Sequence, residues 1–351
     1  MPKSWTDDAQ APEVLKDHAH LKDSFFYTIK RRLLGNPLNR HSLNHQRLSK
    51  RYGLGILSSD CISSSAYGSE QILIALLPAF GLAAFAILMP MTAVVLVILL
   101  IITLSYRDVI NVYTKVGGAY IVSRDNFGPV VAQIAAVALM LDYIVTIAIQ
   151  SAAGVAAIIS TFPSLSPYKI PMILVVIVLL TYGNLRGVKE AGKAFALPTY
   201  FFVGCMFIVF SVGIYKQFNG TLIQLSVEQP GAIEIGQEQG LLTFAAIFIL
   251  LRAFANGGSS LTGLEAISDG VALFKTPEHV NARRTLYIMS TLLGTLVLGV
   301  SWFAHKIHAV PYESGTPTVI SQIAKAIMGD GAVGQIIFVM VLLQMLSIFE
   351  I

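Results

Sequence analysis

Long apolar stretches recur along the chain, and two of them are interrupted by short polar segments. The stretch from Phe80 to Ser105, for example, contains no charged residue. A helix needs about 20 apolar residues to cross the hydrocarbon core of a bilayer. On this measure the sequence predicts eight membrane-spanning helices, at residues 54–79, 80–105, 128–161, 170–186, 194–215, 241–273, 285–304 and 332–349. We therefore expect an all-α polytopic membrane protein, with a polar tail at residues 1–53 and one transmembrane domain at residues 54–351.

Composition supports this class and argues against soluble enzymes. Hydrophobic residues make up 55% of the chain and charged residues 13%, whereas soluble domains are about one quarter charged. The two cysteines, Cys61 and Cys205, lie far apart and form no disulfide or metal-binding pattern. The sequence also has no nucleophile–base pair and no phosphate-binding loop, so we expect neither an enzyme, nor a cofactor, nor a nucleic-acid-binding protein.

Basic residues predict the orientation of the spans. Nineteen Lys and Arg residues fall in the tail and the loops on one side of the predicted membrane, and four fall on the other side. Because basic residues favour the cytoplasmic side, we expect a multi-pass protein of the cell membrane with a cytoplasmic N-terminus. Residues 24–51 contain seven Lys and Arg and no acidic residue. Within them, FFYTIKRRLL is typical of a short amphipathic helix that binds anionic lipids.

The first and sixth spans contain the polar interruptions, SSDCISSSAYG at residues 58–68 and NGGSSLTGLEAIS at residues 256–268. Ser and Asp side chains compete with the helix for backbone hydrogen bonds. Non-helical backbone is tolerated in a bilayer only inside protein or beside a water-filled cavity. Broken helices in equivalent positions of two repeats are typical of inverted-repeat secondary transporters, with the substrate site at the breaks. The residues predicted to break the helices are Ser59, Ser63, Gly257, Gly258, Ser259 and Ser260.

Acidic residues near these breaks predict the chemistry of the site. Asp60, Asp142 and Glu265 lie deep within their spans, and such residues are usually functional. Glu70, Arg252 and Asp269 lie closer to predicted span ends, where water reaches them. Oxygen ligands without His or Cys suit hard cations, and crowded carboxylates disfavour full ionisation, so one of them is a candidate proton carrier. The expected site consists of Asp60, Tyr67, Asp142, Tyr143, Thr146, Thr262 and Glu265.

Five segments together resemble the bacterial KimA-type potassium importers, in the KUP branch of the amino acid–polyamine–organocation (APC) superfamily. They are SSDCISSSAYG, GGAYIVSRDNFG (117–128), LDYIVT (141–146), NLRG (184–187) and SSLTGLEAIS (259–268). The resemblance implies an APC/LeuT-like fold with a ten-helix inverted-repeat core and proton-coupled import of K⁺. It also implies that Asp60, Tyr67, Asp142, Thr146, Thr262 and Glu265 form the ion site, with Tyr143 as a neighbour.

Two alternatives stay open at the level of sequence. One is an amino acid or polyamine permease of the same superfamily, although Asp60 would repel a substrate carboxylate at the first break. The other is an inactive fragment, because the sequence stops at Ile351 within the predicted eighth span and completes only part of the second repeat. A small cation is the expected substrate, and a homodimer is left open.

Overall fold

The computed structural model describes residues 25–26, 30–31, 47–114, 117–185, 188–236, 240 and 243–329. The chain separates into two compact units, residues 1–43 and 44–351. The second unit contains the predicted transmembrane domain. The predicted eighth span, residues 332–349, lies outside the described residues, as does most of the predicted amphipathic segment.

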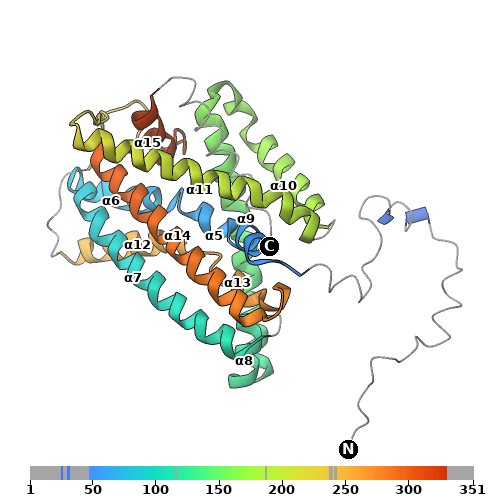
Figure 1. The fold of residues 1–351 in the computed structure, drawn as a ribbon. Helices are drawn as coiled ribbons and strands as arrows, with labels where there is room; N and C mark the ends of the chain where they lie inside the picture. Colours follow the sequence, from blue (N-terminus) through green and yellow to red (C-terminus); the bar gives the residue numbers. More distant parts are fainter. Residues whose placement is uncertain are drawn as a thin grey trace, which may run out of the picture. The chain divides into compact units, whose positions relative to one another are not determined.

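The described part of the second unit is built from α-helices, with short 3₁₀ turns and two isolated β-bridges. Its helices pack against one another, as Figure 1 shows, with longer non-helical segments between α11 and α12 and between α14 and α15. They are α4 (Lys50–Leu57), α5 (Ser59–Ser64), α6 (Gly68–Phe80), α7 (Ala83–Val112), α8 (Gly118–Phe127), α9 (Pro129–Thr161), α10 (Lys169–Leu185), α11 (Val188–Phe218), α12 (Phe244–Gly258), α13 (Ala266–Asp269), α14 (Glu278–Ile307) and α15 (Val319–Met328). The 3₁₀ turns are η2 (Pro163–Tyr168), η3 (Ser259–Leu261) and η4 (Val271–Leu273).

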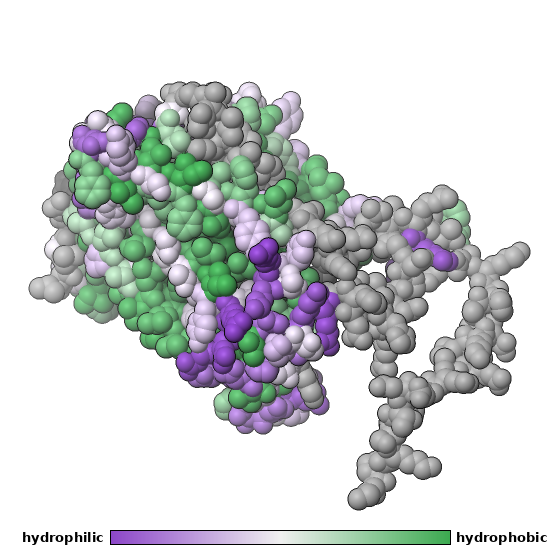
Figure 2. All heavy atoms as spheres, in the orientation of Figure 1, coloured by the Kyte–Doolittle hydropathy of each residue, from purple (hydrophilic) through white to green (hydrophobic). Residues whose placement is uncertain are grey.

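Six segments are long and apolar enough to cross a membrane, and they correspond to the predicted second to seventh spans. Many of their large apolar side chains point outward: Val178 of α10, for example, is 66% exposed. Figure 2 shows apolar residues over much of the visible face of the helices, with hydrophilic residues gathered at the end near α8 and α13. This is the surface that a bundle embedded in lipid presents.

In the interior of the bundle α7 packs against α14 and α6, and α6 packs in turn against α12. Apolar residues such as Leu73, Leu88 and Leu296 are fully buried there. Buried hydroxyls also join the helices: Ser301 of α14 lies 2.7 Å from the Ser69 hydroxyl of α6 and accepts a 2.9 Å hydrogen bond from Thr92 of α7. Small hydroxyl residues of this kind hold membrane helices close together.

The first span begins earlier than predicted, because α4 starts at Lys50 rather than at residue 54. The residues just before α4 are anchored to the end of the sixth span. The Leu48 amide donates to the Leu273 carbonyl (2.7 Å), and the Lys275 amide donates to the Leu48 carbonyl (3.0 Å). Arg47 and Glu278 form an ion pair beside this bridge. The segment around Leu48 therefore ties the first and sixth spans together.

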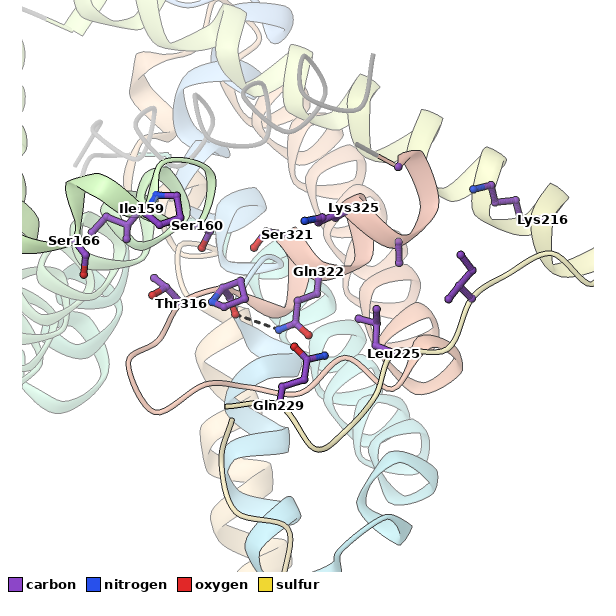
Figure 3. A pocket seen from close by; sticks show the side chains of 15 residues that line it. Ile159, Ser160, Ser166, Lys216, Leu225, Gln229, Thr316, Ser321, Gln322 and Lys325 are labelled. Atoms are coloured by element: carbon purple, nitrogen blue, oxygen red, sulfur yellow. Dashed lines mark hydrogen bonds between the residues drawn. The ribbon is translucent and has the colours of Figure 1, made fainter. Parts of the chain in front are cut away.

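The sequence did not predict α15, whose Val319, Ile320 and Ile323 are buried in the bundle. Its N-terminus is held by two spans, since the Val319 amide donates to the buried Glu70 carboxylate of α6 (3.1 Å) and the Thr318 amide to Ser160 of α9 (3.3 Å). A cavity of about 790 Å³ lies beside α15. Figure 3 shows side chains around it from α9, from α15 and from the segment that follows α11. None of the predicted site residues lines this cavity.

Candidate functional site

The break in the first span follows from its serines. Their hydroxyls all donate to backbone carbonyls three or four residues earlier: Ser58 to Leu54, Ser59 to Ile56 (3.0 Å), Ser63 to Asp60 (2.7 Å), Ser64 to Cys61 (2.7 Å) and Ser65 to Ile62 (2.6 Å). Such bonds compete with the helical ladder. The helix is interrupted at Ser58 and again at residues 65–67. The predicted break is confirmed, although Ser59 and Ser63 lie within the short helix α5 between the two interruptions.

The sixth span breaks in the same way. Ser259, Ser260 and Thr262 donate to the carbonyls of Asn256 (2.6 Å), Gly257 (2.7 Å) and Ser259 (3.2 Å). After η3 the backbone turns at Gly263, whose φ of +82° is readily adopted only by glycine. This break too is confirmed. The predicted break residues Gly257 and Gly258 are the last two residues of α12. Ser259 and Ser260 belong to η3, which follows directly.

The two breaks are in direct contact with each other. The single proton of the Ser64 hydroxyl is shared between the Cys61 carbonyl and the Ser260 carbonyl, which lies 2.8 Å away. Glycines permit this close approach: a Cβ on Gly68 would lie 2.5 Å from the Ser260 Cβ, and a Cβ on Gly263 would lie 2.6 Å from Oδ2 of Asp60. The interrupted stretches of the first and sixth spans, whose Ser64 and Ser260 are 196 residues apart in sequence, therefore meet in the interior of the bundle.

Asp60 lies where the breaks meet and is 3% exposed. One carboxylate oxygen, Oδ1, accepts a hydrogen bond from the side-chain amide of Gln150 on α9. The other, Oδ2, is buried and has no hydrogen-bond partner in the described part of the chain. A buried carboxylate oxygen without a partner is costly. Binding of a proton or of a cation would remove this cost.

Two hydroxyl residues of the predicted site, Tyr67 and Thr262, lie near Asp60. Tyr67 follows α5 and is 8% exposed, and its hydroxyl lies beside Thr262 of the sixth span and Gln150 of α9. Thr146 is also buried, one helical turn before Gln150. The structure thus brings Asp60, Tyr67 and Thr262 together, with α9 closing one side.

The other acids lie close to Asp60 without sharing its position. Glu265 is near enough to Asp60, Asp142 and Asp269 for their charges to interact. Asp142 is exposed in this structure, whereas the sequence placed it deep within the bundle. Among the described residues, no three His, Cys, Asp or Glu side chains converge closely enough to hold one metal ion. The acids therefore form a series of separate negative charges rather than a single carboxylate cage.

No basic side chain neutralises these acids in the part of the chain that the structure describes. The ion pairs there are Arg47–Glu278 and Arg107–Asp108, and neither involves a site residue. Arg252, the one basic residue within a predicted span, is exposed on α12 and makes no ion pair with the acids. A structural Asp–Arg pair therefore does not explain the buried carboxylates.

Sequence reasoning missed Gln150 and underestimated the burial of Glu70. Gln150 is spaced by four residues from Thr146 and by eight from Asp142, so a helical repeat already indicates that it shares their face. Glu70 was expected near water, but it is 7% exposed and binds the N-terminus of α15. Asp269 was expected at a span end.

Asp269 is the last residue of α13 and also holds neighbouring segments together. It accepts a 2.9 Å hydrogen bond from the Tyr143 hydroxyl, and its backbone carbonyl accepts one from the Gly117 amide (3.3 Å). A Cβ on Gly118 would lie 1.8 Å from Oδ1 of Asp269. The glycine pair at residues 117–118 therefore permits α8 to begin directly against the sixth span.

A membrane bundle whose first and sixth spans break and meet at a buried aspartate is the architecture typical of inverted-repeat secondary transporters. Comparison with known proteins agrees: residues 54–350 match the family described as Amino acid permease. The chain belongs to this family. It is also 40% identical over 305 residues to Potassium transporter KimA of Bacillus subtilis (strain 168), a match that covers 87% of this chain and 48% of that protein. The chain thus spans about half the length of this relative.

Proposed function

We propose that this chain forms the ion-binding part of a secondary transporter that imports K⁺ across the cell membrane. The observation that carries the proposal is the buried Oδ2 of Asp60, which has no partner among the described residues and lies where the two helix breaks meet. A weakly hydrated monovalent cation needs several oxygen ligands at once, and Tyr67 and Thr262 supply hydroxyls nearby. The name of the KimA relative supports K⁺ as the substrate.

Coupling to protons is a second part of the proposal. Glu265 is close enough to Asp60, Asp142 and Asp269 for their charges to act on it, and no basic residue balances them in the described chain. Several neighbouring carboxylates are unfavourable when all are charged. Glu265 is therefore our candidate for the group that binds a proton while Asp60 binds the metal ion.

The alternative substrate is an amino acid, which the description of the matching family favours. Transporters with this architecture bind a substrate carboxylate at the positive N-terminal end of a half-helix. In this chain the corresponding half-helix, α6, begins at Gly68, and the buried carboxylates of Asp60 and Glu70 precede it and lie in its first turn. These negative charges disfavour a second carboxylate and favour a cation.

Growth assays distinguish the two substrates. We use a chimera in which this chain replaces the matching region of the Bacillus subtilis relative, because the chain spans about half of that protein. The chimera is expected to restore growth of a bacterium that lacks K⁺ uptake at low external K⁺, and not to restore growth of amino acid auxotrophs with impaired uptake. Rescue of an auxotroph, or no K⁺ rescue by a chimera that reaches the membrane, would contradict the proposal.

We also propose that the N-terminus is cytoplasmic, which follows from the basic residues of the tail and loops. The orientation is testable in a variant whose buried Cys61 and Cys205 are replaced by alanine. Ser314→Cys, in the exposed segment before α15, is expected to react with a membrane-impermeant maleimide in intact cells. Asp125→Cys, on the exposed side of α8, is expected to react only after the membrane is opened. The reverse pattern would place the tail outside.

A further inference from the structure

Gln150 is the one side chain that the structure shows hydrogen-bonded to the Asp60 carboxylate among the residues it describes. Gln150 is itself 1% exposed and belongs to α9, a different span from Asp60. Its amide nitrogen donates to Oδ1, and its side chain also lies beside the Tyr67 hydroxyl. A buried amide in this place is held on two sides, so it can fix the rotation of the carboxylate.

The orientation of the Asp60 carboxylate is important because its two oxygens have different surroundings. Oδ1 is engaged by Gln150, whereas Oδ2 faces the break of the sixth span and has no partner among the described residues. Oδ2 lies against Gly263, where a Cβ would approach it to 2.6 Å and would come within 2.8 Å of the Cys61 amide nitrogen. The arrangement leaves one carboxylate oxygen directed at Gly263 in the break of the sixth span.

An amide has a property that a basic residue would lack in this position. Lys or Arg would orient Asp60 equally well, but it would also cancel its charge. The Gln150 amide donates a hydrogen bond to a charged acceptor, which is stronger than a neutral one, and leaves the full negative charge available. Fixing the carboxylate in advance also reduces the entropy that a bound ion must remove.

We propose that Gln150 is a positioning residue that directs Oδ2 of Asp60 toward a monovalent cation held between the two helix breaks. This inference rests on the proposed function of cation transport. In this proposal α9 acts on the bound ion indirectly, because Gln150 orients Asp60 and does not bind the ion itself.

The first test measures uptake of rubidium, as a substitute for K⁺, by the chimera. Gln150→Leu keeps the approximate size of the side chain and removes its hydrogen bonds. We expect the KM for rubidium to rise about tenfold or more, as for loss of a hydrogen bond to a charged group, with kcat within about twofold of the parent. Gln150→Asn retains an amide and should give an intermediate KM. Ile149→Ala, at a 47% exposed neighbour, is the matched control and should leave the KM unchanged.

The second test needs no transport and uses the 351-residue chain purified in detergent. Melting temperatures are measured for Asp60→Asn, Gln150→Leu and the double variant. If Gln150 contacts Asp60 as described, the shift of the double variant should differ clearly from the sum of the single shifts. Additive shifts would overturn the inference whatever the transport result.

The two tests separate the failure of this inference from the failure of the proposed function. Unchanged KM in Gln150→Leu, with normal uptake by the parent chimera, would overturn the positioning role and leave cation transport in place. A loss of kcat alone at constant KM would likewise contradict it, because that result is expected of a purely structural residue. Absence of rubidium uptake by the parent chimera would overturn the proposed function and, with it, the positioning role of Gln150.

Discussion

Asp60→Asn is expected to abolish K⁺ uptake by the chimera. The substitution preserves the size of the side chain and removes its charge at the position where the two breaks meet. By analogy with breaking a buried ion pair, loss of a directly binding charge should cost about 3–5 kcal/mol. That corresponds to a decrease in affinity of about a hundredfold or more. Growth at low external K⁺ and rubidium uptake both report the effect, and the amount of protein in the membrane is measured in parallel.

A matched control is Asp125→Asn, which removes an acidic charge from an exposed position on α8. This variant should transport like the parent, because a solvated surface charge contributes little. If Asp60→Asn transported K⁺ as the parent does, the assignment of the ion site to the helix breaks would be wrong. A defect of equal size in both variants would indicate a general effect of charge rather than a specific ligand.

Gly263→Ala is expected to eliminate transport and to lower the melting temperature of the chain. The residue has a φ of +82°, and a non-glycine residue in a left-handed conformation costs about 1–2 kcal/mol. The added Cβ would also lie 2.6 Å from the Asp60 carboxylate and 2.8 Å from the Cys61 amide nitrogen. Relieving such overpacking typically costs a further ~1–3 kcal/mol. It would also separate the two breaks, so the ion site should be lost even where the variant folds.

Gly128→Ala separates the cost of a positive φ from the steric clash with Asp60. Gly128 precedes α9 with a φ of +85°, and a Cβ there would meet no atom within 4 Å. This variant therefore carries the conformational cost without the steric clash, and should keep most of its rubidium uptake. Equal loss of uptake in both variants would show that backbone strain, rather than contact with Asp60, makes Gly263 necessary.

The spans and their breaks were predictable because each depends on local sequence. Apolar length alone located the second to seventh spans. The serines of residues 58–65 and the glycines and hydroxyl residues of 256–263 carried the signal for the breaks, since their side chains bond to carbonyls three or four residues away. Contacts of this range can be inferred from a single segment.

The parts that sequence reasoning missed depend on contacts between distant segments. Within α9, helical spacing places Gln150 on the face of Thr146, but its hydrogen-bond partner is identified only when Asp60, 90 residues away in sequence, is placed against it. The burial of Glu70 likewise depends on α15, which is too short to be recognised as a span. The exposure of Asp142 on α9 is also a property of how the helices are arranged, not of the residues around it.

The contact between Ser64 and Ser260 sets a condition on how the protein is made. The two residues are separated by 196 positions, and ribosomes add about 5–20 residues per second. Asp60 and its serines therefore enter the membrane on the order of ten to forty seconds before the sixth span is synthesised. During that interval a polar half of the first span lacks the partner that later shields it. Biogenesis therefore requires that the insertion machinery, or the spans already made, shelter residues 58–68 until the second break arrives.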